Sequence, residues 1–140
     1  MTVASILQVK GSAVYSVTPD ATVREAAATM AERKVGALLV MDKDERLLGL
    51  VSERDFVRVI ARQGDIASTV GEVMTAEVYT CAPSDSISDL MHTMTERRIR
   101  HLPVMNAGRV VGMVSIGDVV KSRMADIEEE ATLLRAYISQ

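Results

Sequence analysis

A seven-residue pattern occurs twice in this chain, and no other feature constrains the fold as strongly. The segment Gly49–Asp55 returns as Gly112–Asp118, and both copies have the glycine, a valine, the serine and the final aspartate at the same places. An internal repeat indicates two copies of one supersecondary unit, and of any site that the unit carries. The repeat extends upstream, where Pro19, Val23, Ala26, Ala27, Met30 and Arg33 correspond to Pro83, Ile87, Leu90, Met91, Met94 and Arg97.

The two copies predict the same order of elements, and the expected fold class is α+β. Pro19 and Pro83 each end an extended segment and precede a helix start. The apolar positions that follow have the i, i+3, i+4, i+7 spacing of an amphipathic helix. Thr22 and Glu25 have the spacing of a capping box, and a shorter-armed counterpart begins at Ser86. We expect opening helices at Val3–Val9 and Thr69–Met74, strands at Ala13–Val17 and Glu77–Cys81, hairpin strands at Ala37–Met41, Leu47–Val51, Leu102–Met105 and Val110–Val114, and closing helices from Glu53 to about Arg62 and from Ile116 onward.

The repeats also predict the domain organisation. Neither copy alone buries much apolar surface, so we expect the two β-α-β-β-α units to pack on each other with pseudo-twofold symmetry. The predicted boundaries are residues 1–66 for the first repeat, 67–125 for the second, and 126–140 for a C-terminal helical extension. Within the extension, Ile127, Ala131, Leu134 and Ile138 form a narrow seam with coiled-coil spacing. We favour a homodimer in which this seam meets a partner helix; the alternative is a helix that folds back on its own domain.

Composition excludes several classes of protein. A chain of 140 residues with 48% hydrophobic residues is long enough to form a packed core. The net charge of −3 argues against a general nucleic-acid-binding face. Cys81 is the single cysteine, so neither a disulfide framework nor a metal site is expected. The N-terminus lacks the features of a signal peptide and no apolar run has the length of a membrane span, so we expect a cytoplasmic protein with no membrane contact.

The repeated motif carries two chemically useful groups. Ser52 follows an apolar strand and begins a helix, so its hydroxyl and the first helical N–H groups are placed to bind an anion. Asp55 lies one turn further on and can accept hydrogen bonds from two vicinal ribose hydroxyls, as an acidic residue does in dinucleotide folds. Ser115 and Asp118 repeat the arrangement. The alternative is that each serine and aspartate only cap their helix, which stabilises it by about 1 kcal/mol.

The doubled pattern resembles the CBS-domain pair, also called the Bateman module, in its free-standing bacterial form. The matching segments are the opening Val17–Val23, the strand Arg100–Val104 and the Gly-x-Val-Ser-x-x-Asp closing motif in both halves. The resemblance covers the chain from about Val3 to Met124. It implies a non-catalytic sensor that binds an adenine nucleotide between the repeats, acts as a homodimer and regulates another, unidentified protein. AMP is the first expected ligand, with ADP, ATP, NAD(H) and S-adenosylmethionine as the other candidates.

The resemblance also implies which residues form the two clefts, each combining the closing motif of one repeat with strands of the other. The first cleft would be formed by Ser52, Arg54, Asp55, Ala76, Glu77, Val78, Arg100, His101 and Leu102. The second would be formed by Ser12, Ala13, Val14, Lys34, Val35, Gly36, Ala37, Met113, Ser115, Ile116 and Asp118. Because Arg100 and His101 offer a cation and a donor where the second cleft has Gly36 and Ala37, we expect the Asp55 cleft to bind phosphate more tightly.

Two other functions compete with the sensor. The first is a constitutive dimerisation or docking protein whose clefts are vestigial, for instance because methionines such as Met113 fill them. The second is an enzyme, which we do not expect. Neither Cys81 nor any serine has the sequence context of an activated nucleophile, and the chain has no Walker-type phosphate loop or metal-ligand spacing.

Overall fold

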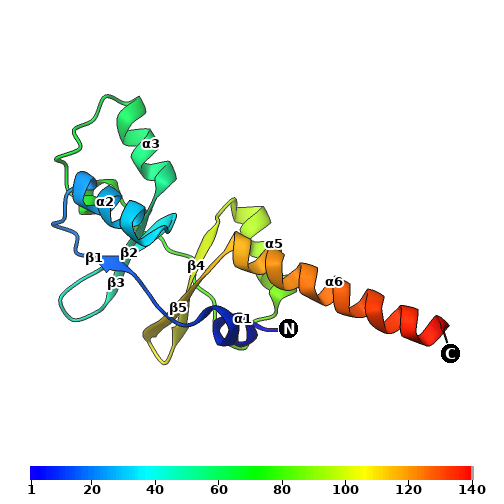
Figure 1. Cartoon of the computed structure of the whole chain (residues 1–140). Helices are drawn as coiled ribbons and strands as arrows, with labels where there is room; N and C mark the ends of the chain where they lie inside the picture. The colour runs from blue at the N-terminus through cyan, green and yellow to red at the C-terminus, as the bar shows by residue number, and fades with distance from the viewer. Residues whose placement is uncertain (140) are drawn as a thin grey trace. The chain divides into compact units, whose positions relative to one another are not determined.

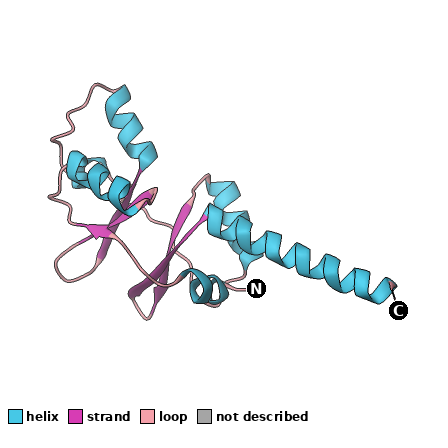
Figure 2. Ribbon diagram, viewed as in Figure 1, coloured by secondary structure: helices cyan, strands magenta, loops and turns pink. Residues whose placement is uncertain are grey.

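The computed structural model describes residues 1–139, and its contacts divide the chain into two compact units. Unit 1 contains Met1–Ser12, Thr80–Asn106 and the chain from Gly112 onward, whereas unit 2 contains Ala13–Tyr79 and Ala107–Val111. Both units combine helices with strands (Figure 2). The predicted α+β fold class is therefore confirmed.

Unit 2 is built around a three-stranded sheet. β1 (Ser16–Val17) runs parallel to β2 (Ala37–Met41), and β2 pairs antiparallel with β3 (Leu47–Ser52). The helices α2 (Val23–Arg33), α3 (Glu53–Ala61) and α4 (Val70–Val73) complete the unit (Figure 1). Its core is aliphatic, with Ala26, Met30, Leu38, Val40, Val51 and Val70 buried together.

Unit 1 contains α1 (Val3–Lys10), α5 (Ile87–Arg97), β4 (His101–Asn106), the C-terminal part of β5 (Arg109–Ser115), and α6 (Ile116–Ile138). β4 and β5 form a two-stranded sheet. An isolated parallel bridge from Cys81 to Val104 takes the place of the β1–β2 pairing in unit 2. Burial, with a smaller contribution from the charge of Asp85, raises the pKa of the Cys81 thiol to about 12. This side chain is therefore a protonated core residue rather than a thiolate nucleophile.

The opening helices contact the body of the opposite sequence repeat. At the start of α1, the N–H groups of Val3 and Ala4 donate to the carbonyls of Asp85 and Pro83. At the start of α4, the N–H groups of Val70 and Gly71 donate in the same way to Ala21 and Pro19. Each unit therefore combines the opening helix of one repeat with the strands and remaining helices of the other.

The predicted helices are largely confirmed. Thr22 and Glu25 form a reciprocal capping box, and the Ser86 hydroxyl accepts a hydrogen bond from the Asp89 N–H at 3.1 Å. The opening and closing helices differ from the expected boundaries by only a few residues, and α6 extends to Ile138.

The first strand of each repeat is shorter than expected. The strand expected at Ala13–Val17 covers only Ser16–Val17, and the one expected at Glu77–Cys81 is reduced to the bridge at Cys81. A strand forms only where its backbone groups find partners. Cys81 does so through β4, because its N–H donates to the carbonyl of Pro103 and its own carbonyl accepts from the N–H of Met105. The sequence pattern of the segment did not show where this pairing begins.

In the C-terminal half of α6, the large apolar side chains of the seam are exposed to solvent. α5 packs against α6 within unit 1, and α6 then continues to the C-terminus (Figure 1). Ile127, Leu134 and Ile138 are 51%, 60% and 73% exposed. The alternative of a helix that folds back on its own domain is therefore wrong. Among the residues that the structure describes, no helix combines the length and apolar character needed to cross a membrane.

Candidate functional site

The closing motif of the first repeat lies at the junction of β3 and α3. β3 ends at Ser52, which pairs with Ala37 in the sheet, and α3 begins at Glu53. The Glu53 N–H donates to the carbonyl of Gly36 at 3.1 Å. The start of the β2–β3 hairpin therefore lies beside the N-terminus of α3 in unit 2.

Asp55 is held in this motif by hydrogen bonds from Ser52. Its Oδ2 accepts from the Ser52 N–H at 2.8 Å and from the Ser52 hydroxyl at 3.3 Å. The residue is only 6% exposed, and Oδ1 lies 3.8 Å from a guanidinium nitrogen of Arg58. The carboxylate is thus fixed in position at the start of α3, with both hydrogen bonds from Ser52 on a single oxygen.

The closing motif of the second repeat reproduces this arrangement in unit 1. Asp118 Oδ2 accepts from the Ser115 N–H at 2.9 Å and from the Ser115 hydroxyl at 3.0 Å. The Ile116 N–H donates to the carbonyl of Arg100 at 2.8 Å, as Glu53 does to Gly36. The backbone at the start of β4 therefore lies beside Ser115.

Helix capping is thus part of what these residues do. Ser52 and Ser115 are the N-caps of α3 and α6, and each is bonded to the aspartate three residues later. Capping and ligand binding are compatible, because a carboxylate has two oxygens and the capping bonds end on Oδ2 in both motifs.

The sequence interpretation missed Lys10, which lies at the second motif. Its ammonium donates to Asp118 Oδ2 at 2.7 Å and to the carbonyl of Met113 at 2.8 Å. Lys10 is the last residue of α1, more than one hundred positions away in the sequence. In the sequence, Lys10 is visible only as a lysine at the end of an opening helix, and this position does not identify Asp118 as the residue that it contacts.

The electrostatics of Asp118 reflect two opposing effects. Partial burial raises the pKa of this carboxyl, but hydrogen bonds from Lys10 and Ser115, together with the Lys10 charge, outweigh burial and lower the pKa below its ordinary value. The carboxylate is therefore ionised at neutral pH.

Because its pKa is lowered on folding, Asp118 should make stability depend on pH. Its contribution is fully present above the unfolded-state pKa of about 3.9 and is lost as the pH falls through the lower pKa of the folded state. We expect the difference in unfolding free energy between the wild-type protein and Asp118→Asn to be largest near neutral pH and to shrink below about pH 4. Urea unfolding at a series of pH values measures this difference, and a value that does not change between pH 7 and pH 3 would contradict the assignment.

Three of the remaining predicted residues meet at a pocket within unit 2. Lys34, Val35 and Gly36 line a pocket of about 540 Å³ together with Glu53 and Phe56. Lys34 is the left-handed C-cap of α2, with φ of 57°. The structure therefore brings this segment to the start of α3 within the same unit.

The other predicted residues differ in their exposure. In unit 2, Arg54, Ala76, Glu77 and Ala13 are exposed, Val78 and Val14 are half-buried, and Ala37 is buried. In unit 1, Arg100 and Ser12 are exposed, His101, Met113 and Ile116 are half-buried, and Leu102 is buried. The assignment of these residues to two clefts that span the repeats stays a prediction. Within residues 1–139 no group of three or more His, Cys, Asp or Glu side chains is placed to hold a metal ion.

Comparisons with known proteins find the same doubled unit. The family model of the CBS domain matches residues 8–62 and again residues 70–125. The chain is 37% identical to the CBS domain-containing protein CBSX3, mitochondrial, of Arabidopsis thaliana, over 98% of this chain and 71% of that protein. These matches cover both closing motifs.

Solved structures agree with the sequence comparisons. A putative signal-transduction protein with CBS domains from Burkholderia ambifaria has a TM-score of 0.87 at 46% identity, covering 90% of this chain and 96% of that one. The CBS domain protein PAE2072 from Pyrobaculum aerophilum, solved in complex with AMP, has a TM-score of 0.77 at 28% identity, covering 84% of this chain and 89% of that one.

Proposed function

We propose that this chain, which belongs to the CBS-domain family, is a non-catalytic regulatory module that binds an adenine nucleotide at its two closing motifs. The observation that carries the proposal is the duplicated placement of a serine and an ionisable carboxylate at a strand-to-helix junction. The AMP complex of the similar protein PAE2072 supports the ligand class.

Each motif offers complementary groups to a nucleotide. The aspartate can accept hydrogen bonds from the ribose hydroxyls, and the positive end of the α3 or α6 dipole favours the anionic phosphate. Aliphatic side chains would contact the adenine, so no aromatic residue is required. AMP is our first candidate, and ADP, ATP, NAD(H) and S-adenosylmethionine remain in the set to be tested.

A thermal-shift series tests the proposal. Protein shown to be free of ligand is melted with AMP, ADP, ATP, NAD, NADH, S-adenosylmethionine and adenosine. A ligand at one hundred times its Kd stabilises the native state by about 2.7 kcal/mol, which corresponds to a shift of several degrees at this chain length. A shift with at least one phosphorylated nucleotide is expected. The absence of any shift would favour the second candidate, a constitutive docking protein.

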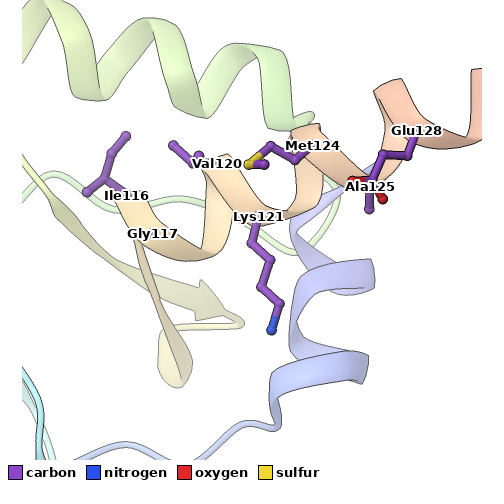
Figure 3. A pocket seen from close by; sticks show the side chains of 7 residues that line it. All are labelled: Ile116, Gly117, Val120, Lys121, Met124, Ala125 and Glu128. Carbon is purple, nitrogen blue, oxygen red and sulfur yellow. The ribbon is translucent and has the colours of Figure 1, made fainter. Parts of the chain in front are cut away.

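A surface on α6 favours self-association for either candidate. Ile116, Val120 and Met124 line a shallow depression of about 520 Å³ along the helix, with Lys121 pointing away from them (Figure 3). Val120 and Met124 are 44% and 57% exposed. This apolar stripe continues in sequence into the seam that begins at Ile127, so we propose that a second copy of the chain covers it.

The seam predicts a specific effect on assembly. Leu134→Glu places a charge in the proposed interface and should shift the protein from dimer to monomer in sedimentation velocity. Leu133→Glu is the matched control, because Leu133 is 63% exposed against 60% for Leu134 and lies outside the seam. We expect the control to keep the dimer. Equal dissociation by both variants, or by neither, would exclude the seam as the interface.

A further inference from the structure

We infer that Lys10 is a ligand-contacting residue of the Ser115–Asp118 motif, and that it makes this motif select phosphorylated over unphosphorylated nucleosides. The inference rests on the proposed function, because it concerns the same motif. It adds a residue that neither the repeat nor the family resemblance identifies.

The hydrogen bonds of Lys10 leave it able to bind an anion. A lysine ammonium has three donors. Within residues 1–139 Lys10 uses two of them, one for Asp118 Oδ2 and one for the carbonyl of Met113. The side chain is 33% exposed, so it is accessible to a ligand. One donor on a positioned cation is therefore available to an acceptor from outside the chain.

α1 continues to Lys10, past the residue that packs against its sheet, whereas the opening helix of the other repeat does not. In unit 2, α4 ends at Val73, and Met74 then packs against Gly49 of β3. In unit 1, Leu7 packs against Gly112 of β5 in the corresponding way, but α1 continues to Lys10. Only the second motif therefore receives a cation from its opening helix.

The pair of Lys10 and Asp118 suits a ligand with a neutral diol and an anionic group. The carboxylate accepts from hydroxyl donors but repels a phosphate, whereas the ammonium attracts the phosphate through a charge-assisted hydrogen bond. Loss of the Lys10 charge should therefore weaken AMP binding and have little effect on adenosine. From the sequence we expect the Asp55 cleft to bind phosphate more tightly, and Lys10 would give the Asp118 motif a phosphate contact of its own.

Calorimetric titration with AMP and with adenosine tests the inference. Each titration is made on the wild-type chain, on Asp55→Ala to isolate the second motif, and on Asp55→Ala combined with Lys10→Met. The matched control combines Asp55→Ala with Lys43→Met, which removes the same charge from the exposed β2–β3 turn. We expect Lys10→Met to weaken AMP binding by about tenfold or more, the effect of one charge-assisted hydrogen bond. Adenosine binding should change by less than about threefold, and the control should match its parent.

Other outcomes would overturn the inference in distinguishable ways. Equal losses for AMP and adenosine would show that Lys10 only positions Asp118, and tighter AMP binding would show that Lys10 obstructs the motif. If the wild-type chain binds AMP but Asp55→Ala does not, the proposed function stands and the role of Lys10 is wrong. If the wild-type chain binds none of the nucleotides, both the function and the inference are wrong.

Discussion

Replacing Gly49 with alanine is expected to lower the free energy of unfolding by about 2–4 kcal/mol. A Cβ at this position would lie 2.6 Å from the Met74 sulfur and 2.7 Å from the backbone carbonyl oxygen of Thr75. Thr75 is tied to β3, since it exchanges backbone hydrogen bonds with Leu50 at 2.9 and 3.0 Å. The sulfur can move, but the carbonyl can do so only if this pairing is disturbed.

Gly112→Ala is the matched control for Gly49→Ala. The three atoms nearest to a Cβ at Gly112 all belong to the Leu7 side chain, and the closest two are its methyl ends at 2.8 and 3.0 Å, which can rotate away. We expect a loss of about 1 kcal/mol or less, measured by urea unfolding of both variants. A loss at Gly49 no larger than that at Gly112 would contradict the fixed approach of the Thr75 carbonyl to Gly49.

Removing the carboxylates of the closing motifs should have the largest effect on binding. Asp55→Ala and Asp118→Ala should each weaken nucleotide binding at their own motif by about one hundredfold, because several hydrogen bonds to a charged acceptor are lost together. The double variant should bind no detectable nucleotide at concentrations that saturate the wild-type chain. Each single variant should stay folded, because the loss of one helix cap lowers stability by only about 1 kcal/mol. Calorimetry measures the affinity, and a thermal melt of each variant checks the fold.

Glu25→Ala separates binding from capping. Glu25 is also the third residue of its helix and its carboxylate accepts a hydrogen bond from the N–H of the N-cap Thr22 at 3.3 Å, but it belongs to α2 and not to a closing motif. We expect this control to lower stability slightly and leave nucleotide affinity unchanged. Unchanged affinity in Asp55→Ala and Asp118→Ala would leave capping as the whole role of the two aspartates.

The fold could be predicted to a large extent because the sequence repeats itself. The helix and hairpin positions followed from periodicity and from caps such as Thr22, which are local signals. The grouping of α1 with Pro83 and Asp85 depends on hydrogen bonds between distant segments. No periodicity in the sequence encodes that grouping, and the same is true of the single bridge at Cys81.

The candidate site was predictable only where its residues are close in sequence. Ser52 with Asp55, and Ser115 with Asp118, are bonded as the three-residue spacing indicated. Lys10 could not be found in this way, because its contact with Asp118 exists only once α1 has packed beside β5 and α6. When a side chain reaches a site from a helix that is distant in the sequence, the spacing of residues within the site motif does not reveal it.

Equilibrium dialysis of AMP against the ligand-free chain is the most direct test of the central claim. It counts bound nucleotide without depending on the enthalpy of binding. We predict saturable binding at one or two AMP per chain, and no detectable binding in the double variant Asp55→Ala/Asp118→Ala. Equal AMP concentrations on both sides of the membrane, or saturation that survives in the double variant, would contradict the claim that the closing motifs bind the nucleotide.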